Sequence, residues 1–175
     1  INLPDAQATI YGSGVRNPQG LYIDPQGTIW ETEHGPQGGD ELNIIRAGKD
    51  YGWPDVSYGR QYDARRTDGR KNVPVGNGRT SMPGVEEPRY FWVPSIAPSG
   101  LAFYTGDLFP DWKGNLFVGA MAGQALVRLV LDGERVVSEE RLLTDLKQRI
   151  REVRQGPVGE LYIFAGDALL RITPK

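Results

Sequence analysis

The sequence contains no cysteine and a single histidine, His34, among its 175 residues. Without cysteine the chain forms no disulfide, holds no metal through thiolates and has no cysteine nucleophile. One histidine excludes a zinc site built from several histidines, and a Ser-His-Asp triad would have to use His34 itself. If the protein is an enzyme, its chemistry therefore rests on carboxylates, arginines, backbone groups or a cofactor.

The sequence also lacks an excess of one charge and any long hydrophobic run. Lys plus Arg number 20 and Asp plus Glu number 22, so the formal net charge is −2. A chain without a broad basic field is not expected to bind nucleic acid through its phosphates. No apolar run approaches the roughly 20 residues that span a bilayer, and the first residues do not have the pattern of a signal peptide. We therefore expect no nucleic-acid partner and no membrane span.

Glycine, proline and short β-type runs are abundant instead. The chain has 23 Gly, 13 Pro and 39% hydrophobic residues, which predicts a folded, turn-rich protein of short strands. One helix is predicted over 139–146, and Asp132-Gly133 is typical of a tight hairpin turn. The predicted strands cover residues 21–23, 28–32, 41–45, 100–104, 115–120, 125–131, 135–138, 151–154, 160–164 and 168–172.

A strand–turn–strand pattern recurs along the chain. Residues 20–30 align with residues 152–162, each with a turn closed by glycine, and residues 100–118 form a third copy with a longer turn. A further predicted strand follows each copy. This repetition predicts a β-propeller with one small antiparallel sheet per copy. A β-sandwich with one disordered loop is the alternative. Residues 46–94 interrupt the repeat as a long excursion, and such excursions usually carry function.

Arg16 and Asn17 form a polar pair at the entry to a predicted strand, with Gly14 and Gly20 on either side. An arginine grips a carboxylate with two parallel N–H groups, and an asparagine both donates and accepts hydrogen bonds. The pair is therefore a candidate binding site. Capping of the turn by Asn17 before Pro18 is the alternative.

Arg149 and Arg151 point to the same face if their segment is a strand, because the side-chain period of a strand is two. Two guanidinium groups on one face repel each other unless an anion lies between them. A ligand that carries carboxylates would satisfy both. The alternative is a solvated edge strand whose arginines pair with Glu152 or Asp145.

Residues 30–43 place several acidic residues around a Gly/Pro turn. Carboxylates and turn carbonyls at close spacing suit a hard cation such as Ca²⁺. No EF-hand spacing is present, and a solvated acidic loop is an equally weighted alternative. His34 in this turn is expected to be a hydrogen-bonded turn residue and not a catalyst. The carboxylates are those of Glu31, Glu33, Asp40 and Glu41.

Aromatic residues gather at the two ends of the excursion, within residues 51–62 and 90–94. Aromatic faces stack on flat ligands and on sugar rings. Most such residues in propellers belong to the core, so these residues alone predict no ligand.

Taken together, these motifs resemble one family, the soluble pyrroloquinoline-quinone (PQQ)-dependent sugar dehydrogenases, and most closely its bacterial aldose sugar dehydrogenase branch. The match covers nearly the whole chain, and the run E-H-G-P-Q-G-G-D-E-L-N at 33–43 is highly specific. The family fold is an all-β, six-bladed β-propeller of about twice this length. The resemblance implies that residues 1–175 are the C-terminal half of one propeller domain, with about three blades of four-stranded antiparallel sheets. The other matching runs lie at 16–21, 51–54, 94–100 and 149–154.

The resemblance implies a cofactor role for several residues. It implies that Arg16 and Asn17 contact the quinone part of PQQ, that Tyr62 lies at the cofactor, and that Arg149 and Arg151 bind its carboxylates. A further lining stretch is implied at Ala120, Met121 and Ala122. Relatives carry a lysine where this sequence has an alanine at 122. One positive contact to PQQ is therefore expected to be lost, with Gln124 as a hydrogen-bonding substitute.

The resemblance also implies two calcium sites. Gly35 and Pro36 match positions whose main-chain carbonyls hold the Ca²⁺ bound to the cofactor. Glu41 and Tyr51 match a second, structural calcium site, to which Tyr51 contributes its carbonyl.

The implied reaction is oxidation of an aldose sugar at its anomeric carbon to a lactone. Hydride passes to the quinone, and an external electron acceptor reoxidises the cofactor. The family's catalytic base is a histidine that no position here matches, so we expect it in a missing N-terminal half and expect this chain alone to be inactive. We also expect the chain to associate with that half or with another copy, or to aggregate. A periplasmic or secreted location is implied as well.

Two other functions stay open at this stage. The first is a non-catalytic, ligand- or protein-binding propeller fragment, which the absence of a matching histidine favours. The second is a calcium-dependent propeller hydrolase such as a lactonase. That enzyme would need several carboxylate and asparagine side chains converging on one ion, so it ranks third.

Overall fold

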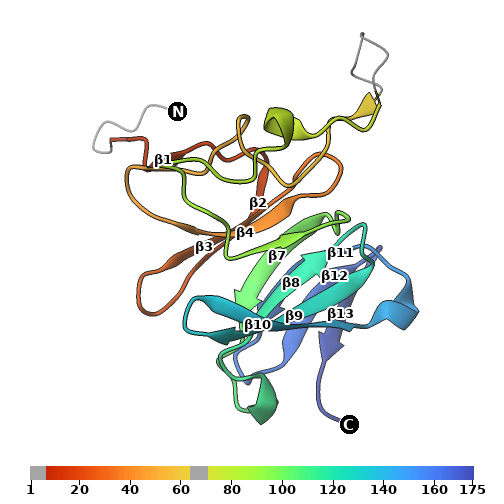
Figure 1. The fold of residues 1–175 in the computed structure, drawn as a ribbon. Coiled ribbons are helices and arrows are strands. Elements are labelled where there is room, and N and C mark those ends of the chain that lie inside the picture. The colour runs from red at the N-terminus through yellow and green to blue at the C-terminus, as the bar shows by residue number, and fades with distance from the viewer. Residues whose placement is uncertain (1–6, 64–70) are drawn as a thin grey trace.

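The computed structural model describes residues 7–63 and 71–175, so the pattern of the first six residues lies outside the described part. Nearly all regular structure in these ranges is β-strand, and no α-helix forms in them. Three antiparallel sheets follow one another along the chain (Figure 1). Their strands, in spatial order, are β2 (Pro18–Ile23), β3 (Ile29–Glu33), β4 (Asp40–Ile45) and β6 (Tyr90–Trp92); β7 (Pro98–Phe103), β8 (Leu116–Ala120), β9 (Ala125–Asp132) and β10 (Arg135–Leu142); and β11 (Ile150–Gln155), β12 (Leu161–Ala165) and β13 (Ala168–Ile172).

Short elements complete the described fold. Two-residue strands β1 (Gly12–Ser13) and β5 (Lys49–Asp50) pair in parallel. The 3₁₀ turns are η2 (Val75–Gly78), η3 (Pro110–Trp112) and η4 (Thr144–Leu146). No helix within the described ranges has the length and apolar character needed to cross a bilayer.

The turns between neighbouring strands form as their sequences predict. In the β2–β3 turn, the Asp24 carboxylate accepts the backbone N–H groups of Gln26 at 3.0 Å and Thr28 at 2.8 Å. In the β9–β10 hairpin, Asp132 pairs with Arg135, and the glycine between them has a φ of +60°. Residues with short polar side chains and glycine are favoured in such turns because they accept these conformations and bond their own backbone.

The predicted helix over 139–146 is wrong. Residues 139–142 are the second half of β10, where Glu139 pairs with Leu129 and Arg141 with Val127 across the sheet. Leu143 then takes a left-handed conformation with a φ of +58°, and η4 follows. The charged residues of this segment have good helix propensity. Pairing along β9 outweighs that weak local preference, because it satisfies the backbone and places Leu142 over apolar neighbours.

The excursion over 46–94 is not only loop. Its last part is β6, which pairs with β4 and supplies the fourth strand of the first sheet. The sequence predicts only an aromatic loop end there, because a three-residue strand is too short to show a period of two. The third sheet has three strands in the described residues, in place of the four expected for each blade.

The core consists of two apolar layers between successive sheets. Trp30 and Leu42 of the first sheet pack against Leu101 and Val118 of the second. On the other face of β8, Phe117 packs with Val153 and Ile163 of the third sheet. Because successive side chains of β8 alternate between the two layers, this strand must be apolar on both faces. The first strands β2, β7 and β11 consequently lie next to one another at the middle of the molecule.

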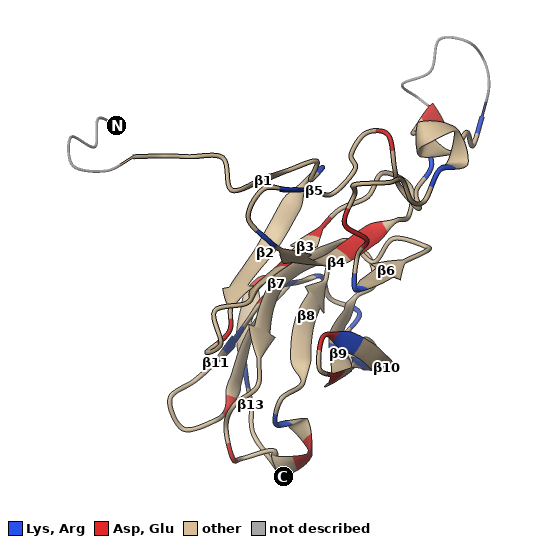
Figure 2. Cartoon of the chain, turned by 60° about the vertical axis from the view of Figure 1, so that its left-hand side comes forward, with Lys and Arg blue, Asp and Glu red and all other residues tan. Residues whose placement is uncertain are grey.

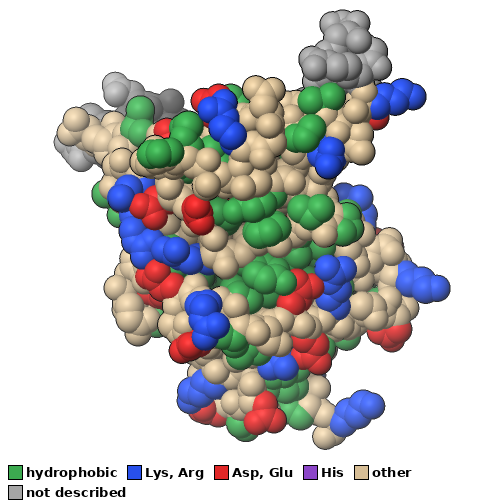
Figure 3. Space-filling model, in the orientation of Figure 1, with side chains coloured by type: hydrophobic (Ala, Val, Ile, Leu, Met, Phe, Trp, Pro, Cys, Tyr) green, Lys and Arg blue, Asp and Glu red, His purple; other side chains and the backbone are tan. Residues whose placement is uncertain are grey.

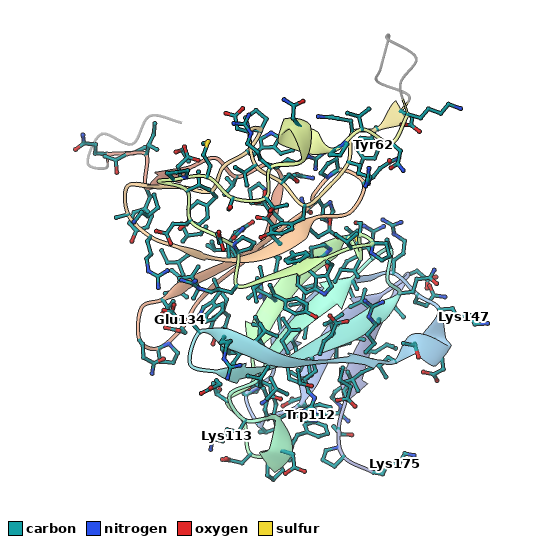
Figure 4. The ribbon with its side chains drawn as sticks, viewed as in Figure 1. Tyr62, Trp112, Lys113, Glu134, Lys147 and Lys175 are labelled. Carbon is teal, nitrogen blue, oxygen red and sulfur yellow. The ribbon has the colours of Figure 1, made fainter. Side chains whose placement is uncertain are left out.

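An ionic contact joins the outer parts of the first two sheets. Glu134, in the β9–β10 hairpin, forms ion pairs with Arg46 at 2.8 Å and Arg89 at 3.2 Å. Figure 4 labels Glu134 at the hairpin tip, turned toward the first sheet. Elsewhere on the face seen in Figure 3, positive and negative side chains are interspersed, in agreement with the near-zero net charge. Exposed ion pairs contribute at most about 1 kcal/mol each, so the apolar layers dominate stability.

Gly20 is a position at which a single methyl group should destabilise the fold. A Cβ atom built there would lie 2.5 Å from the Ser99 carbonyl oxygen and 2.7 Å from Leu101 and Thr32 side-chain atoms. We expect Gly20→Ala to lower the free energy of unfolding by about 3 kcal/mol, because this junction of β2 and β7 has no room to relax. Urea unfolding of the full-length protein measures the effect.

Gly12 provides the matched control for this substitution. The nearest atom to a Cβ at Gly12 lies 3.4 Å away, an ordinary contact. Gly12→Ala should therefore change stability by less than about 1 kcal/mol. Equal effects of the two substitutions would contradict the close packing of β2 on β7.

Candidate functional site

The residues predicted to bind the cofactor gather at one end of the three sheets. Arg16 and Asn17 directly precede β2, and Arg149 and Arg151 flank the first residue of β11. Met121 follows the last residue of β8, which pairs with the first residue of β7. All five therefore lie where the adjacent strands β2, β7 and β11 begin, although the first and the last of them are 135 residues apart in sequence.

Hydrogen bonds hold these strand starts together. The Ser99 hydroxyl of β7 donates to the Ile150 carbonyl of β11 at 2.8 Å. The Thr32 hydroxyl of β3 donates to the Ser99 carbonyl at 3.0 Å. His34 Nε2 lies 2.7 Å from the Pro98 carbonyl oxygen. This end of the molecule is thus tied across all three sheets by buried or half-buried polar contacts.

The Arg16 side chain contacts the turn predicted to bind calcium. Its Nη1 donates to the carbonyl oxygens of His34 at 2.7 Å and Gly35 at 3.0 Å. Its guanidinium lies over the ring of Trp53, 5.1 Å from the ring centroid. A cation above an indole face is attracted to it, so Trp53 helps to hold the guanidinium in place.

Tyr62 makes the corresponding contact on the next residue of the turn. Its hydroxyl donates to the Pro36 carbonyl at 2.9 Å. Figure 4 shows Tyr62 among the loops above the first sheet. Two residues predicted at the cofactor, Arg16 and Tyr62, therefore contact the two carbonyls predicted for calcium. Each carbonyl oxygen has a second lone pair, which leaves it able to accept a cation.

Glu33 fixes the backbone of the Arg16–Asn17 pair. Its Oε2 accepts the backbone N–H of Arg16 in a short hydrogen bond and that of Asn17 at 3.1 Å. The Asn17 side-chain oxygen instead accepts from Gln19 Nε2 at 3.1 Å, and its amide nitrogen lies 3.5 Å from His34 Nδ1. The loop is thus held by the Glu33 carboxylate rather than by capping from Asn17.

The acidic residues of this region are buried, so a solvated acidic loop is the wrong interpretation. Glu31, Glu33 and Glu41 are only 3%, 4% and 8% exposed. They lie on one face of β3 and β4, whose acidic segments are red in Figure 2. Three carboxylates on one buried face call for a compensating positive charge or for protons.

Asn43 lies between these carboxylates and cannot satisfy them all. Its Nδ2 is 3.3 Å from Glu31 Oε2, 3.4 Å from Glu33 Oε1 and 3.3 Å from Glu41 Oε2. An amide group has two hydrogens and so bonds at most two of the three at once. In the described part of the chain, Glu31 Oε1 and Asn43 Oδ1 have no hydrogen-bond partner. Unpaired buried oxygens of this kind are acceptors suited to a hard cation.

Burial and mutual repulsion raise the pKa values of the cluster. Burial raises the pKa of Glu31 to about 9, and the nearby charge of Glu33 adds to the shift. Burial raises the pKa of Glu41 to about 8, again with a contribution from Glu33. Burial also raises the pKa of Glu33, although the N–H groups of Arg16 and Asn17 oppose that shift. A cation would replace the protons that these groups otherwise hold at neutral pH.

A small cavity lies beside this cluster. Its volume is about 10 Å³, enough for about one water-sized sphere and far too small for an organic cofactor. Residues predicted for both calcium sites line it, since Gly35, Glu41 and Tyr51 all border the cavity. In residues 7–63 and 71–175, no group of three or more acidic or histidine side chains is arranged to hold a metal ion. A cation here would therefore need main-chain carbonyls in addition to carboxylates, which fits the predicted ligands.

The cluster predicts a characteristic pH dependence of stability. The raised pKa values mean that Glu31 and Glu41 stay protonated in the folded protein while the unfolded chain loses these protons above pH 4.5. Without Ca²⁺, the free energy of unfolding should fall as pH rises from about 5 to 8, by up to about 1.4 kcal/mol per pH unit for each group. Ca²⁺ binds the deprotonated form, so it should reduce or reverse this slope. Urea unfolding at pH 6, 7 and 8, with a chelator or with Ca²⁺, measures both effects.

Glu31→Gln is the informative variant for this prediction. It removes one titrating group and keeps the size of the side chain, so the slope in chelator should become shallower. A stability that is constant from pH 6 to 8 and unaffected by Ca²⁺ would show that the cluster neither titrates nor binds calcium.

Arg149 and Arg151 face each other across the side chain of Met121. Arg149 Nη2 lies 3.7 Å and Arg151 Nη1 lies 3.6 Å from the Met121 sulfur. This confirms that the two guanidinium groups share a face. Between described residues neither forms an ion pair, and Glu152 instead contacts Arg154 at 3.4 Å. The alternative, in which Glu152 or Asp145 neutralises the pair, is therefore wrong.

The turn that carries Met121 rests on the segment before β7. The Met121 N–H donates to the Ala97 carbonyl at 2.9 Å, and the Ala122 N–H donates to the Ile96 carbonyl at 2.8 Å. Ala120 is buried at the end of β8 and pairs with Pro98. Met121 is thus presented to the arginines by a backbone-bonded turn, while Ala122 is exposed.

The aromatic residues at the ends of the excursion divide between core and loop. Tyr51 and Trp92 are 5% and 3% exposed, and the Tyr51 hydroxyl donates to the Ile44 carbonyl at 2.7 Å. Tyr58 and Phe91 stack with their ring centroids 3.8 Å apart. Phe91 is 43% exposed, and Tyr51 and Trp53 both border the small cavity, so only part of this aromatic group serves the core.

Comparison with known proteins gives the family. The sequence model of the family described as Glucose / Sorbosone dehydrogenase matches residues 1–171. The chain belongs to this family. It is 40% identical over 174 residues to the aldose sugar dehydrogenase YliI of Escherichia coli strain K12, an alignment that covers 97% of this chain and 45% of YliI. It therefore spans about half the length of the curated relatives it matches.

Solved structures agree with this assignment. A crystal structure of a glucose dehydrogenase is 47% identical and superimposes with a TM-score of 0.84 over 95% of this chain and 47% of that chain. The PQQ-bound form of an aldose sugar dehydrogenase from Streptomyces coelicolor shares the fold, with a TM-score of 0.68 and 24% identity over 97% of this chain and 47% of that chain. The expected family and its β-propeller fold are confirmed.

Three residues at the site have contacts that the sequence-based prediction did not include, although Glu33 and Asp40 were among the predicted cation carboxylates. Glu33 holds the Arg16 backbone, Trp53 lies under the Arg16 guanidinium, and Asp40 accepts the Gly35 N–H at 2.9 Å. The alternation of Glu31 and Glu33 along one strand face was a usable signal for Glu33. Trp53 belongs to the aromatic cluster and to the matching run 51–54, but no sequence pattern predicted its contact with Arg16, because its loop reaches Arg16 from a distant part of the chain.

Proposed function

We propose that this chain belongs to a PQQ- and calcium-dependent dehydrogenase that oxidises aldose sugars at the anomeric carbon to lactones. Its membership of a sugar dehydrogenase family supports the oxidoreductase assignment. The observation that carries the cofactor assignment is the convergence of Arg16 and Tyr62 on the carbonyls of Gly35 and Pro36. Residues with a predicted affinity for PQQ and residues with a predicted affinity for calcium thereby form one connected site.

The basic groups of the chain suit an anionic, flat ligand. Arg149 and Arg151 offer two guanidinium groups without an ion-pair partner in the described residues, and each can bond a carboxylate of PQQ. Met121 lies between them as an apolar surface. Arg16 would lie at the quinone end, where its fixed positive charge stabilises negative charge. When bound, PQQ supplies a hydride acceptor, which no side chain can provide.

The calcium donors of the proposal are oxygen atoms, as a hard cation requires. The carbonyls of Gly35 and Pro36 would hold the ion at the cofactor. Glu41 and the Tyr51 carbonyl would hold a second ion at the small cavity, which Glu33 also lines. The raised pKa values of the cluster support a cation there, since burial and, to a smaller extent, repulsion from Glu33 raise them, and a bound cation would offset both.

The proton acceptor for the sugar hydroxyl is proposed to lie outside residues 1–175. Both ring nitrogens of His34 are engaged, Nε2 at 2.7 Å from the Pro98 carbonyl and Nδ1 at 3.5 Å from Asn17 Nδ2, so this residue orients the site rather than accepting a proton from substrate. An external electron acceptor and a periplasmic location complete the proposal, by likeness to the family.

Dye-linked oxidation of glucose and other aldoses by the full-length protein tests the proposal. After addition of Ca²⁺ and PQQ, dye reduction should appear and should require both additions. A PQQ-induced absorbance change without turnover would indicate a non-catalytic binding protein. Hydrolysis of lactones without PQQ would indicate a hydrolase. Either result would reject the dehydrogenase assignment.

A further inference from the structure

Asp40 is a buried carboxylate at the first position of β4 and accepts four hydrogen bonds. It has no exposed surface. Its Oδ1 accepts the Gly35 N–H at 2.9 Å. Its Oδ2 accepts the Ser95 hydroxyl at 2.7 Å and the N–H groups of Ile96 and Ala97 at 2.8 Å each. The two oxygens thus bond to two separate segments, the turn at Gly35 and the segment that leads into β7.

Both segments belong to the candidate site. Gly35 offers one of the carbonyls proposed for calcium. The Ile96 and Ala97 carbonyls accept the N–H groups of the turn that carries Met121, which lies between the two arginines. Asp40 therefore bonds directly to the turn at Gly35 and Pro36, called here the calcium turn. It also bonds to Ile96 and Ala97, which in turn bond to the turn that carries Met121.

The calcium turn has little room to adjust without this anchor. A Cβ on Gly35 would collide with the main-chain carbonyls of Gly38 and Gly39, so the turn is folded tightly on itself. The Gly35 carbonyl also accepts from Arg16 on its other side. The Gly35 N–H and the Gly35 carbonyl belong to the two rigid peptide planes on either side of the same Cα atom. The hydrogen bond from this N–H to Asp40 therefore helps to set the direction of the carbonyl.

We propose that Asp40 is a positioning residue, which fixes the position of the calcium turn relative to the turn that carries Met121. It thereby fixes the position of the Gly35 carbonyl relative to Arg149 and Arg151. This rests on the proposed function. Only a carboxylate meets the requirement, because both oxygens accept. An asparagine would turn its NH₂ group toward donors on one of the two segments.

Asp40→Asn in the full-length protein tests the proposal, with Asp24→Asn as the matched control. Asp24 also accepts two backbone N–H groups and, at 3.1 Å, the indole N–H of Trp30, but it lies in the β2–β3 turn at the far end of the first sheet. The readouts are the Ca²⁺ concentration that half-saturates the PQQ absorbance signal, kcat, the KM for the sugar, and the Tm.

We expect Asp40→Asn to raise the half-saturating Ca²⁺ concentration at least about tenfold and to lower kcat at least about tenfold, with KM changed less than about threefold. Asp24→Asn should lower the Tm alone. A folded Asp40→Asn protein with the calcium requirement and kcat of the parent would overturn the proposal and leave Asp40 a structural residue.

If Asp40→Asn does not fold, Ser95→Ala decides the matter. It removes one of the four donors, so the half-saturating Ca²⁺ concentration should rise about two- to fivefold. An unchanged value would reject the positioning role. If the parent protein gives no PQQ absorbance signal at all, the proposed function itself is rejected. If the parent and the variant give the same signal with the same Ca²⁺ requirement, only the role of Asp40 is rejected.

Discussion

Replacing both Arg149 and Arg151 by alanine is expected to weaken PQQ binding by the full-length protein about a thousandfold. Each guanidinium is without an ion-pair partner in the described residues and lies on the same face beside Met121. A hydrogen bond to a charged group contributes about 1.5–3 kcal/mol, and two such losses give a factor of roughly this size. Titration of PQQ in the presence of Ca²⁺, followed by absorbance, measures the change.

The double variant should fold normally, because both side chains are exposed and their contacts with the Met121 sulfur are weak. Arg135→Ala serves as the matched control. Its side chain is 71% exposed and forms an ion pair with Asp132 at the hairpin, away from the strand starts. It should leave PQQ affinity unchanged. Equal affinity of the double variant and the parent would remove the arginine face from the site.

Arg16→Ala is expected to lower kcat by about 10²–10³ at saturating PQQ and Ca²⁺. The Arg16 Nη1 holds the His34 and Gly35 carbonyls, and the guanidinium places a fixed positive charge beside the calcium turn. Loss of a preorganised charge or donor at a reacting centre commonly costs this much in rate. Steady-state kinetics with saturating sugar measures the effect, together with the Tm as a check on folding.

Arg16→Lys separates charge from geometry. Lysine keeps the positive charge, but its shorter stem does not place a nitrogen where Arg16 Nη1 lies between the His34 and Gly35 carbonyls, so we expect a loss of about tenfold, between the parent and the alanine variant. Its stacking on Trp53 should also weaken, since an ammonium lacks a flat face. A kcat of Arg16→Ala within threefold of the parent would show that this arginine plays no part in the reaction.

The strands were predictable because each is bounded by strong turn signals. Asp24 and Asp132 with their following glycines mark two hairpins that the structure confirms. The failure at 139–146 has a clear cause, since alternating charged residues on an outer strand carry helix-favouring side chains while their backbone pairs with β9. The three-residue strand β6 was not predictable, because its pairing with β4 depends on where a long excursion returns.

In the site, too, features set by neighbouring residues were predictable, whereas features set by contacts between distant segments were not. Strand periodicity predicted a shared face for Arg149 and Arg151, and both side chains contact Met121, although β11 begins between them at Ile150 and its register shifts there. The burial of Glu31 and its neighbours was left open, because the same acidic pattern describes a solvated loop. The loop that contains Tyr51, Trp53 and Val56 lines a cavity with Glu33 and Glu41, and no local pattern predicts that this loop returns to the acidic strands. The hydrogen bonds of Asp40 to residues 55–57 positions away had no sequence signature.

The most direct test of the central claim is a crystal structure of the full-length protein grown with Ca²⁺ and PQQ. We predict a calcium ion on the Gly35 and Pro36 carbonyls, with carboxylates of PQQ on Arg149 and Arg151 and its quinone end at Arg16. A well-ordered PQQ bound away from these residues, or calcium coordinated elsewhere with both carbonyls still bonded only to Arg16 and Tyr62, would contradict it.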